Sequence, residues 1–318
     1  MRSEFELKIA DSVRANSAVF LRRAAAELVA DYSYDDAPLQ QERATVVTAF
    51  TQMSLELALV SFLIRNNGIR CIIQGASSLT DQEIETKWQN NTLRTQRFED
   101  NKKLLEDTSP DIYDFFEGLI DDFQRKRNKI VHFHYSFDDG DLYDVKYEAA
   151  SILVHLVSKL MYGHEDSVDY PEKLKALLSD DLFANLVRFP PYVHYVADIA
   201  AENSNKVLTC IECDQVTFSD LEMKCFACTF EYRDGELINC PSCGETAVLF
   251  DNLNIDINDS VPALCLSCGI RSSAFQCKEC DLISAAFALN DCRYCSDEEG
   301  AAEPTPGHAL PAVQPKII

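Results

Sequence analysis

Two sets of residues in this chain have types and spacings that could carry out chemistry. The first is a run of six Cys-x-x-Cys pairs in the last third of the sequence, which uses all but one of the 13 cysteines. A Cys-x-x-Cys turn presents two thiolates to one metal ion, and two such turns complete a tetrahedral four-cysteine site. The sequence therefore predicts three metal centres, with Cys71 left over as an ordinary core residue.

Pairing of neighbouring turns leaves loops of 11, 21 and 11 residues within the three centres. The predicted groups are Cys210, Cys213, Cys225 and Cys228, then Cys240, Cys243, Cys265 and Cys268, and finally Cys277, Cys280, Cys292 and Cys295. The array resembles tandem zinc ribbons, so three structural zinc ions are expected to supply the folding energy of segments too small to bury a core. Interleaved pairing and iron–sulfur ligation remain open, because both use the same ligands. Six tandem turns disfavour a thioredoxin-like redox motif, which needs a single one at a helix start.

The second set is the run 125–132, Arg-Lys-Arg-Asn-Lys-Ile-Val-His, in which four of the first five residues are basic. The whole chain has 52 acidic and 29 basic residues and a net charge of −23, which excludes a general electrostatic nucleic-acid binder. Arg127 follows the apolar residues of its predicted helix, where a guanidinium is costly unless it meets an anion, a carboxylate or a second subunit. Asn128 and His132 share a helix face, but Arg127 and His132 lie about 140° apart. A joint cleft therefore requires a two-fold dimer.

The elements that must position these residues are mostly helices. Apolar residues recur at helical spacing over 15–31, 38–67 and 143–162, and a further helix that begins near Ser109 and Pro110 carries the basic run. The acidic segment 137–141 is expected to be a loop. From Cys210 onward the helical period is lost, so the sequence predicts a mainly α chain that ends in a small-β, metal-stabilised region.

The predicted domain organisation has four parts. Residues 1–165 form an α-helical domain, 166–206 a helical extension or linker, 207–297 three tandem zinc ribbons, and 298–318 a disordered tail rich in acidic residues, Pro and Ala. The N-terminus has no apolar run long enough for a signal peptide, and the most apolar stretch, 50–64, is shorter than the roughly 20 residues that span a bilayer. The sequence therefore predicts a cytoplasmic protein without a membrane anchor.

The order arginine, polar residue, three residues and histidine, late in a long helix of an all-α domain, resembles the signature of the HEPN family. Arg127 to His132 match this signature without gaps, and the apolar helix around 50–59 resembles the family's second helix. The resemblance covers residues 15–162. It implies a HEPN-like helical bundle and a metal-independent endoribonuclease that acts as a dimer in toxin–antitoxin or phage-defence systems. It further implies catalytic roles for Arg127, Asn128 and His132, and substrate binding by Arg125, Lys126 and Lys129.

The expected reaction is attack of the ribose 2′-OH on the adjacent phosphate, which leaves a 2′,3′-cyclic phosphate and a 5′-OH. DNA lacks this hydroxyl and is disfavoured as a substrate. Between 207 and 300 the chain has 17 acidic and five basic residues, so the ribbons are expected to dock a protein partner rather than nucleic acid. This acidity also disfavours a zinc-dependent transcription factor. The alternative is a non-catalytic HEPN–zinc-ribbon adaptor that dimerises and docks protein partners.

Overall fold

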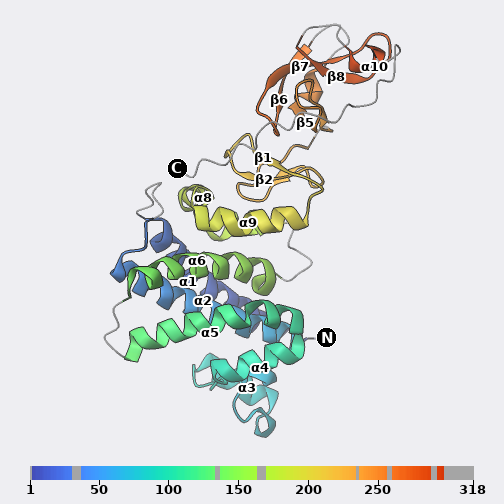
Figure 1. Cartoon of the computed structure of the whole chain (residues 1–318). Helices are drawn as coiled ribbons and strands as arrows, with labels where there is room; N and C mark the ends of the chain where they lie inside the picture. Colours follow the sequence, from blue (N-terminus) through green and yellow to red (C-terminus); the bar gives the residue numbers. More distant parts are fainter. Residues whose placement is uncertain are drawn as a thin grey trace. The chain divides into compact units, whose positions relative to one another are not determined.

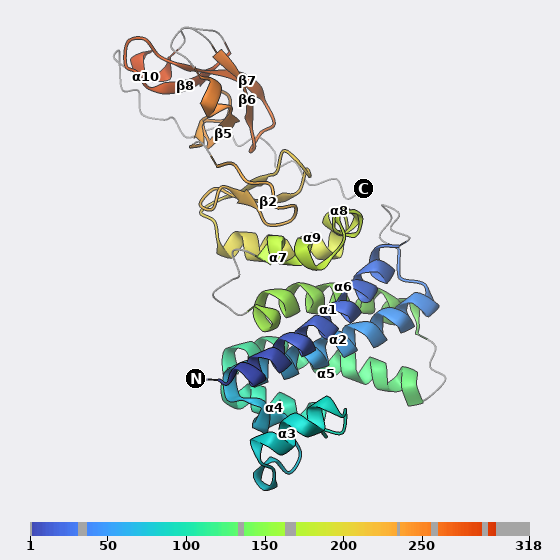
Figure 2. The same cartoon turned by 180° about the vertical axis from the view of Figure 1, so that it is seen from behind.

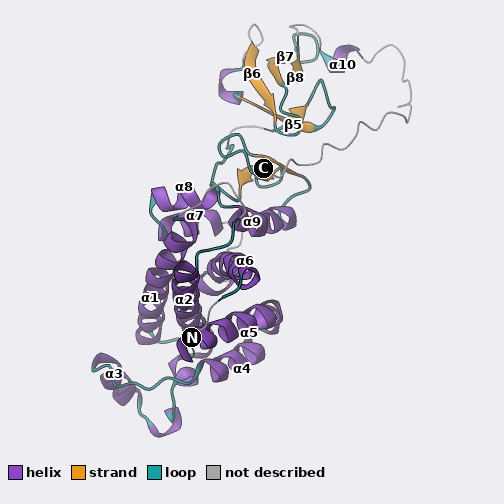
Figure 3. Cartoon of the chain, turned by 60° about the vertical axis from the view of Figure 1, so that its left-hand side comes forward, coloured by secondary structure: helices purple, strands orange, loops and turns teal. Residues whose placement is uncertain are grey.

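The chain consists of N-terminal helices followed by small antiparallel sheets, as the sequence predicts (Figures 1 and 3). The computed structural model describes residues 2–30, 37–132, 137–162, 170–233, 236–255, 260–287 and 292–296. The chain divides into two compact units, residues 1–195 and 196–318. The boundary between these units falls within the segment 166–206 that the sequence predicts as an extension. The predicted disordered tail, 298–318, lies outside the described residues.

Helices make up most of the described part of the chain before residue 203. They are α1 (Glu4–Val29), α2 (Gln41–Asn67), α3 (Asp81–Gln89), α4 (Phe98–Thr108), α5 (Pro110–His132), α6 (Asp139–His155), a π-helical turn (Leu156–Met161), α7 (Tyr170–Leu177), α8 (Asp180–Val187), α9 (Pro190–Glu202) and the short α10 (Arg293–Ser296). Gly68 ends α2 with a φ of 89°, which a residue with a Cβ adopts only with strain. The predicted start of α5 at Pro110 is confirmed.

Side-chain caps decide two helix starts that apolar periodicity placed too late. Helix α1 begins at Glu4 rather than near residue 15, because Ser3 caps it in a reciprocal capping box with Glu6. Helix α6 begins at Asp139, inside the segment that the sequence predicts as a loop. There the Asp138 side chain accepts a hydrogen bond from the backbone N–H of Asp141 and so caps α6.

Helix α2 lies at the centre of the N-terminal unit and packs against α1, α4, α5 and α6. It runs side by side with α1 (Figure 2), where the buried Ser61 hydroxyl donates to the backbone oxygen of Ala10 (2.8 Å). By length and composition α2 could cross a membrane, but 67% of its most apolar stretch is buried against the rest of the protein. Such burial is typical of the core helix of a soluble protein.

The C-terminal unit has two antiparallel sheets. Their strands are β1 (Val207–Thr209), β2 (Val216–Ser219) and β3 (Lys224–Cys225) in the first sheet, and β4 (Ile238–Asn239), β5 (Thr246–Phe250), β6 (Ser260–Cys265), β7 (Arg271–Gln276) and β8 (Ile283–Ala286) in the second. Each strand pairs with its neighbour in the chain, and the two outer strands β4 and β8 also approach each other. The second sheet therefore curls towards a barrel whose turns carry cysteines.

Candidate metal centres and candidate active site

The twelve paired cysteines form three groups of four, and the grouping follows the order of the chain. The ligand atoms of each group lie within 4.8 Å of one another. The closest Sγ–Sγ contacts are 3.6 Å between Cys210 and Cys228, 3.8 Å between Cys243 and Cys265, and 3.6 Å between Cys277 and Cys295. All thirteen cysteines are free thiols, so none is used in a disulfide. Each group therefore has the geometry of a metal-binding site.

Five of the six Cys-x-x-Cys turns are built in the same way. The backbone N–H of the first cysteine donates to the carbonyl five residues later, and this cysteine's own carbonyl accepts from the residue four positions later, as in Cys240 N to Glu245 O (2.8 Å) and Gly244 N to Cys240 O (3.0 Å). The residue after the second cysteine adopts a positive φ. These residues are Asp214, Thr229, Gly244, Gly269 and Asp281. The turn at Cys292 differs, because α10 follows it directly.

Two of these five turns have glycine at the left-handed position, and three have another residue there. Gly244 and Gly269 satisfy the left-handed conformation without strain. Asp214 and Asp281 tolerate it, since short polar side chains are the commonest non-glycine residues in this region. Thr229, at a φ of 70°, is β-branched and strained there. The signal that could have found all five is the shared position after the second cysteine.

Replacement of Thr229 by asparagine is expected to raise the free energy of unfolding of the C-terminal unit by about 1 kcal/mol, because it relieves left-handed strain that costs roughly 1–2 kcal/mol per residue. Denaturant titration of the metal-loaded chain measures this change. Thr229→Ala is the matched control, since alanine removes the hydroxyl but keeps part of the conformational cost. An equal gain in both variants would mean that strain at this φ is not the cause.

The first centre has a hydrogen bond beyond its four cysteines. The Thr217 hydroxyl lies 3.2 Å from Cys225 Sγ, and both residues are fully buried. Hydrogen bonds from Cys210, Cys213 and Cys228 lower the pKa of the Cys225 thiol, and Thr217 adds to this effect. A lowered pKa favours the thiolate, which is the form that binds a metal ion.

The three centres differ in exposure. In the first and third centres two cysteines are buried and two are half-buried, whereas in the second centre Cys243 and Cys268 are exposed. The buried thiols Cys240 and Cys265 hold that centre to β4 and β6. The second centre is therefore the most exposed of the three.

Arg127 lies on the buried side of α5, as its spacing predicts. Ile112, Phe116, Ile120 and Phe123 are fully buried on this side, and Arg127 comes one turn later as a half-buried residue. Its Nη1 atom donates to Oδ1 of Asn128 (3.0 Å). No carboxylate oxygen of the described residues lies within 4 Å of its guanidinium. The structure thus brings Arg127 and Asn128 together and leaves the positive charge without a described counterion.

Two other basic residues of the run, Lys126 and Arg125, pair with acidic side chains of the same chain. Lys126 Nζ lies 2.7 Å from Oε1 of Glu148 on α6 and 3.8 Å from Oδ2 of Asp144. Burial raises the pKa of the Glu148 carboxyl, and hydrogen bonding from Lys126 opposes this shift. Arg125 is exposed and pairs with Asp122. Lys126 therefore joins α5 to α6 in addition to any role in binding.

Helix α5 extends to His132, so this histidine is placed one to two turns after Arg127. The side chains of Lys129 and His132 lie outside the described part of the structure. Arg127 and Asn128 are therefore the members of the predicted catalytic set whose side-chain contacts are described.

Helix α2 presents an apolar stripe to solvent that sequence reasoning identified only as a helical period. Met53 is 43% exposed, and Val46, Phe50, Leu57 and Val60 on the same side are half-buried. Phe20 of α1 stacks on Phe50 with 6.0 Å between ring centroids, and the neighbouring Val19 is 51% exposed. We call these seven residues the α1–α2 apolar face.

No family model, curated protein or solved structure matches this chain.

Proposed function

We propose that this protein is a metal-independent endoribonuclease of the HEPN type, which acts as a homodimer and carries three zinc centres in a C-terminal docking unit. The observation that carries the proposal is Arg127, a half-buried cation at the end of an otherwise apolar helix side. A buried charge is stabilised only by a partner. Because no described carboxylate pairs with Arg127, an RNA phosphate is the partner that we propose.

The proposed chemistry uses the RNA's own 2′-OH as the nucleophile. Arg127 stabilises the negative charge that develops on the phosphorane-like transition state, and its hydrogen bond to Asn128 supports its orientation. His132 transfers a proton, a role that suits an ordinary imidazole pKa near 6.5. Arg125, Lys126 and Lys129 attract the RNA strand. The products are a 2′,3′-cyclic phosphate and a 5′-OH.

The α1–α2 apolar face supports the dimeric state. Its α2 residues follow the alternating three- and four-residue spacing of a coiled-coil seam, which is a pattern that buries well against a copy of itself. Large exposed apolar patches on soluble proteins mark interaction sites. Since α2 packs against α5, such an interface lies one helix away from the helix of Arg127.

Met53→Glu is expected to convert the dimer to a monomer, because it places a charge in the centre of the α1–α2 apolar face. Light scattering after gel filtration measures the mass, with a Kd increase of at least 100-fold expected. Leu253→Glu is the matched control, since Leu253 is 77% exposed in the C-terminal unit. A Met53→Glu chain that remains dimeric at micromolar concentration would show that the dimer interface is not the α1–α2 apolar face.

Zinc is the metal that we propose for the three centres. Four sulfur atoms at about 2.3 Å from a tetrahedral zinc ion lie about 3.8 Å apart, close to the recorded contacts of 3.6 to 3.8 Å. A multi-iron cluster would hold its cysteine sulfurs farther apart, because several metal ions lie between them.

Each zinc ion with four thiolates adds a charge of about −2 to a unit that is already acidic. This negative charge favours a protein partner over nucleic acid.

The test is incubation of the purified chain with single-stranded RNA in EDTA, followed by analysis of the product ends. Cleavage that leaves a 2′,3′-cyclic phosphate, with 2′-deoxy substrate intact, supports the proposal.

The second candidate function is the non-catalytic adaptor, favoured by the ion pairs that occupy Arg125 and Lys126. It predicts no cleavage of any RNA. A cytoplasmic location and a role in toxin–antitoxin or phage defence follow from the resemblance and belong to the same proposal.

A further inference from the structure

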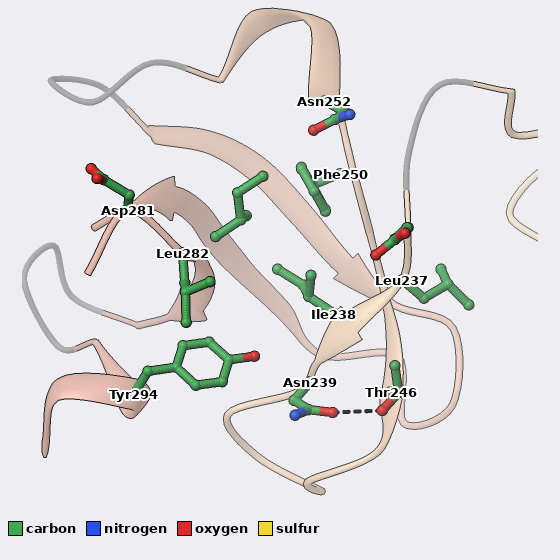
Figure 4. A pocket seen from close by; sticks show the side chains of 11 residues that line it. Leu237, Ile238, Asn239, Thr246, Phe250, Asn252, Asp281, Leu282 and Tyr294 are labelled. Carbon is green, nitrogen blue, oxygen red and sulfur yellow. Dashed lines mark hydrogen bonds between the residues drawn. The ribbon is translucent and has the colours of Figure 1, made fainter. Parts of the chain in front are cut away.

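A pocket of about 910 Å³ opens in the C-terminal unit, and none of its lining residues is a cysteine (Figure 4). It lies where β4, the end of β5, the start of β8 and α10 meet. Its volume is in the range of natural ligand pockets, which often occupy the mouths of small barrels. Its apolar lining consists of Leu237, Ile238, Phe250, Leu282, Ile283 and Tyr294.

The apolar side chains of the pocket are more exposed than a monomer's core would leave them. Leu282 is 49% exposed and Tyr294 is 42% exposed. In Figure 4 the side chains of Leu282, Tyr294 and Ile238 border one space, and Phe250 lies above it in this view. A cluster of this kind is an interaction site rather than scattered surface residues.

The charged residues of the pocket are all acidic among the residues described. Glu236 and Asp281 line it, no lysine or arginine does, and neither carboxylate has an ion-pair partner in the described chain. Asp281 and Leu237, the neighbour of Glu236 in the sequence, lie on opposite sides of the pocket (Figure 4). The Asp281 carboxylate points outwards from the space between the apolar side chains, so its charge lies on the rim of the pocket (Figure 4). A ligand that extends beyond the pocket therefore meets negative charge at the rim and apolar side chains inside. Nucleic acids and anionic lipids are repelled by such a rim.

The pocket also has a polar group suited to a peptide backbone. Asn239 accepts a hydrogen bond from the Thr246 hydroxyl through Oδ1 (2.6 Å), which orients its amide as drawn in Figure 4. Its Nδ2 group has no hydrogen-bond partner among the described residues and can donate to a carbonyl oxygen. A placed amide donor beside an apolar lining can fix the orientation of a bound ligand, and a peptide carbonyl is a suitable acceptor.

We infer that this pocket binds a short segment of a partner protein, with large apolar side chains flanked by lysine or arginine. The charge complementarity selects this occupant, because such a segment brings cations to Asp281 and Glu236 while its apolar side chains cover Leu282 and Tyr294. The inference deepens the docking role in the proposed function and rests on that role, but it does not depend on RNA cleavage.

The test is selection of a phage-displayed library of random 12-residue peptides on the full-length, zinc-loaded chain. We expect the recovered peptides to carry at least two large apolar residues and at least one lysine or arginine. Synthetic copies, measured by fluorescence anisotropy, should bind Leu282→Glu at least tenfold more weakly than the unmodified chain. Leu221→Glu is the matched control, since Leu221 is 56% exposed in the same unit but outside the pocket, and it should bind normally.

A second variant and a truncation complete the test. Asp281→Asn, which removes the charge and keeps a residue that tolerates the left-handed conformation, should also weaken binding, and zinc content and thermal transitions check the folding of each variant. Recovery of no peptide, of peptides without basic residues, or of peptides that bind both pocket variants normally would overturn the inference. Recovery only from a chain without residues 298–318 would make the chain's own tail the occupant and overturn the partner. RNA cleavage by the same preparations separates failure of docking from failure of the nuclease.

Discussion

Replacement of Arg127 by alanine is expected to lower the rate of RNA cleavage by about 10²- to 10³-fold, the usual cost of removing one donor that stabilises transition-state charge. The reason is its position: the guanidinium is held half-buried at the end of the apolar side of α5, bonded to Asn128 and without a described carboxylate. Initial rates on single-stranded RNA, with product ends identified, measure the loss. His132→Ala should lose about 10²- to 10⁴-fold through proton transfer.

Arg125→Ala is the matched control for charge. Arg125 is two residues away, exposed and paired with Asp122, so its loss should change the rate by less than about tenfold at moderate ionic strength. Helical circular dichroism and the dimer mass verify that each variant is folded. Equal losses in Arg125→Ala and Arg127→Ala would indicate general attraction of RNA rather than transition-state stabilisation. Full activity of Arg127→Ala would overturn the proposed site.

The second large effect is expected from loss of metal. Cys225→Ser should unfold the first centre and its three-stranded sheet, because Cys225 is fully buried, belongs to β3 and binds through a thiolate that Thr217 supports. Structural zinc contributes roughly 10–16 kcal/mol to the folding of zinc-finger peptides, so one lost ligand exceeds the effect of any surface substitution. Metal analysis should fall from about three to about two zinc ions per chain, the number expected from two turns per site.

Cys71→Ser is the control for this experiment. Cys71 lies in the helical unit, where burial raises the pKa of its thiol to about 11, and it belongs to none of the three groups. Its replacement should leave three zinc ions bound. A Cys225→Ser chain that keeps three zinc ions would contradict the assignment of Cys225.

In a chelator time course we expect the second centre to lose its metal first, because Cys243 and Cys268 are exposed.

The features that the sequence predicted correctly depend on residues that are close together in the chain. Cysteine spacing is a local property, and the turn that brings two thiolates together closes within five residues, so the six turns were predictable. Which two turns share a centre was left open by the sequence and was decided by the structure, which groups neighbouring turns. Arg127 on the buried side of α5 was predictable for the same reason, since helical periodicity is local. The reciprocal cap of Thr80 and Glu83 at α3 is a further local pattern that the structure contains.

Other features depended on contacts between distant segments. Both sides of α2 are apolar, so its sequence could not indicate that the side with Met53 faces solvent; only the packing of α1, α4, α5 and α6 decided this. The ion pair of Lys126 with Glu148 required the approach of α6 to α5. The pocket between β4 and the start of β8 exists because the five-stranded sheet curls until these two outer strands approach each other.

The sequence by itself determined the six Cys-x-x-Cys turns, the helical character of the first 200 residues and the place of Arg127 on its helix. Each depends on residues within one turn or one helix. The tertiary structure alone decided which apolar stripe is exposed, which basic residues are already paired and where the acidic pocket opens. These outcomes depend on side chains that are far apart in the chain and meet only after folding, when burial and charge pairing act across elements.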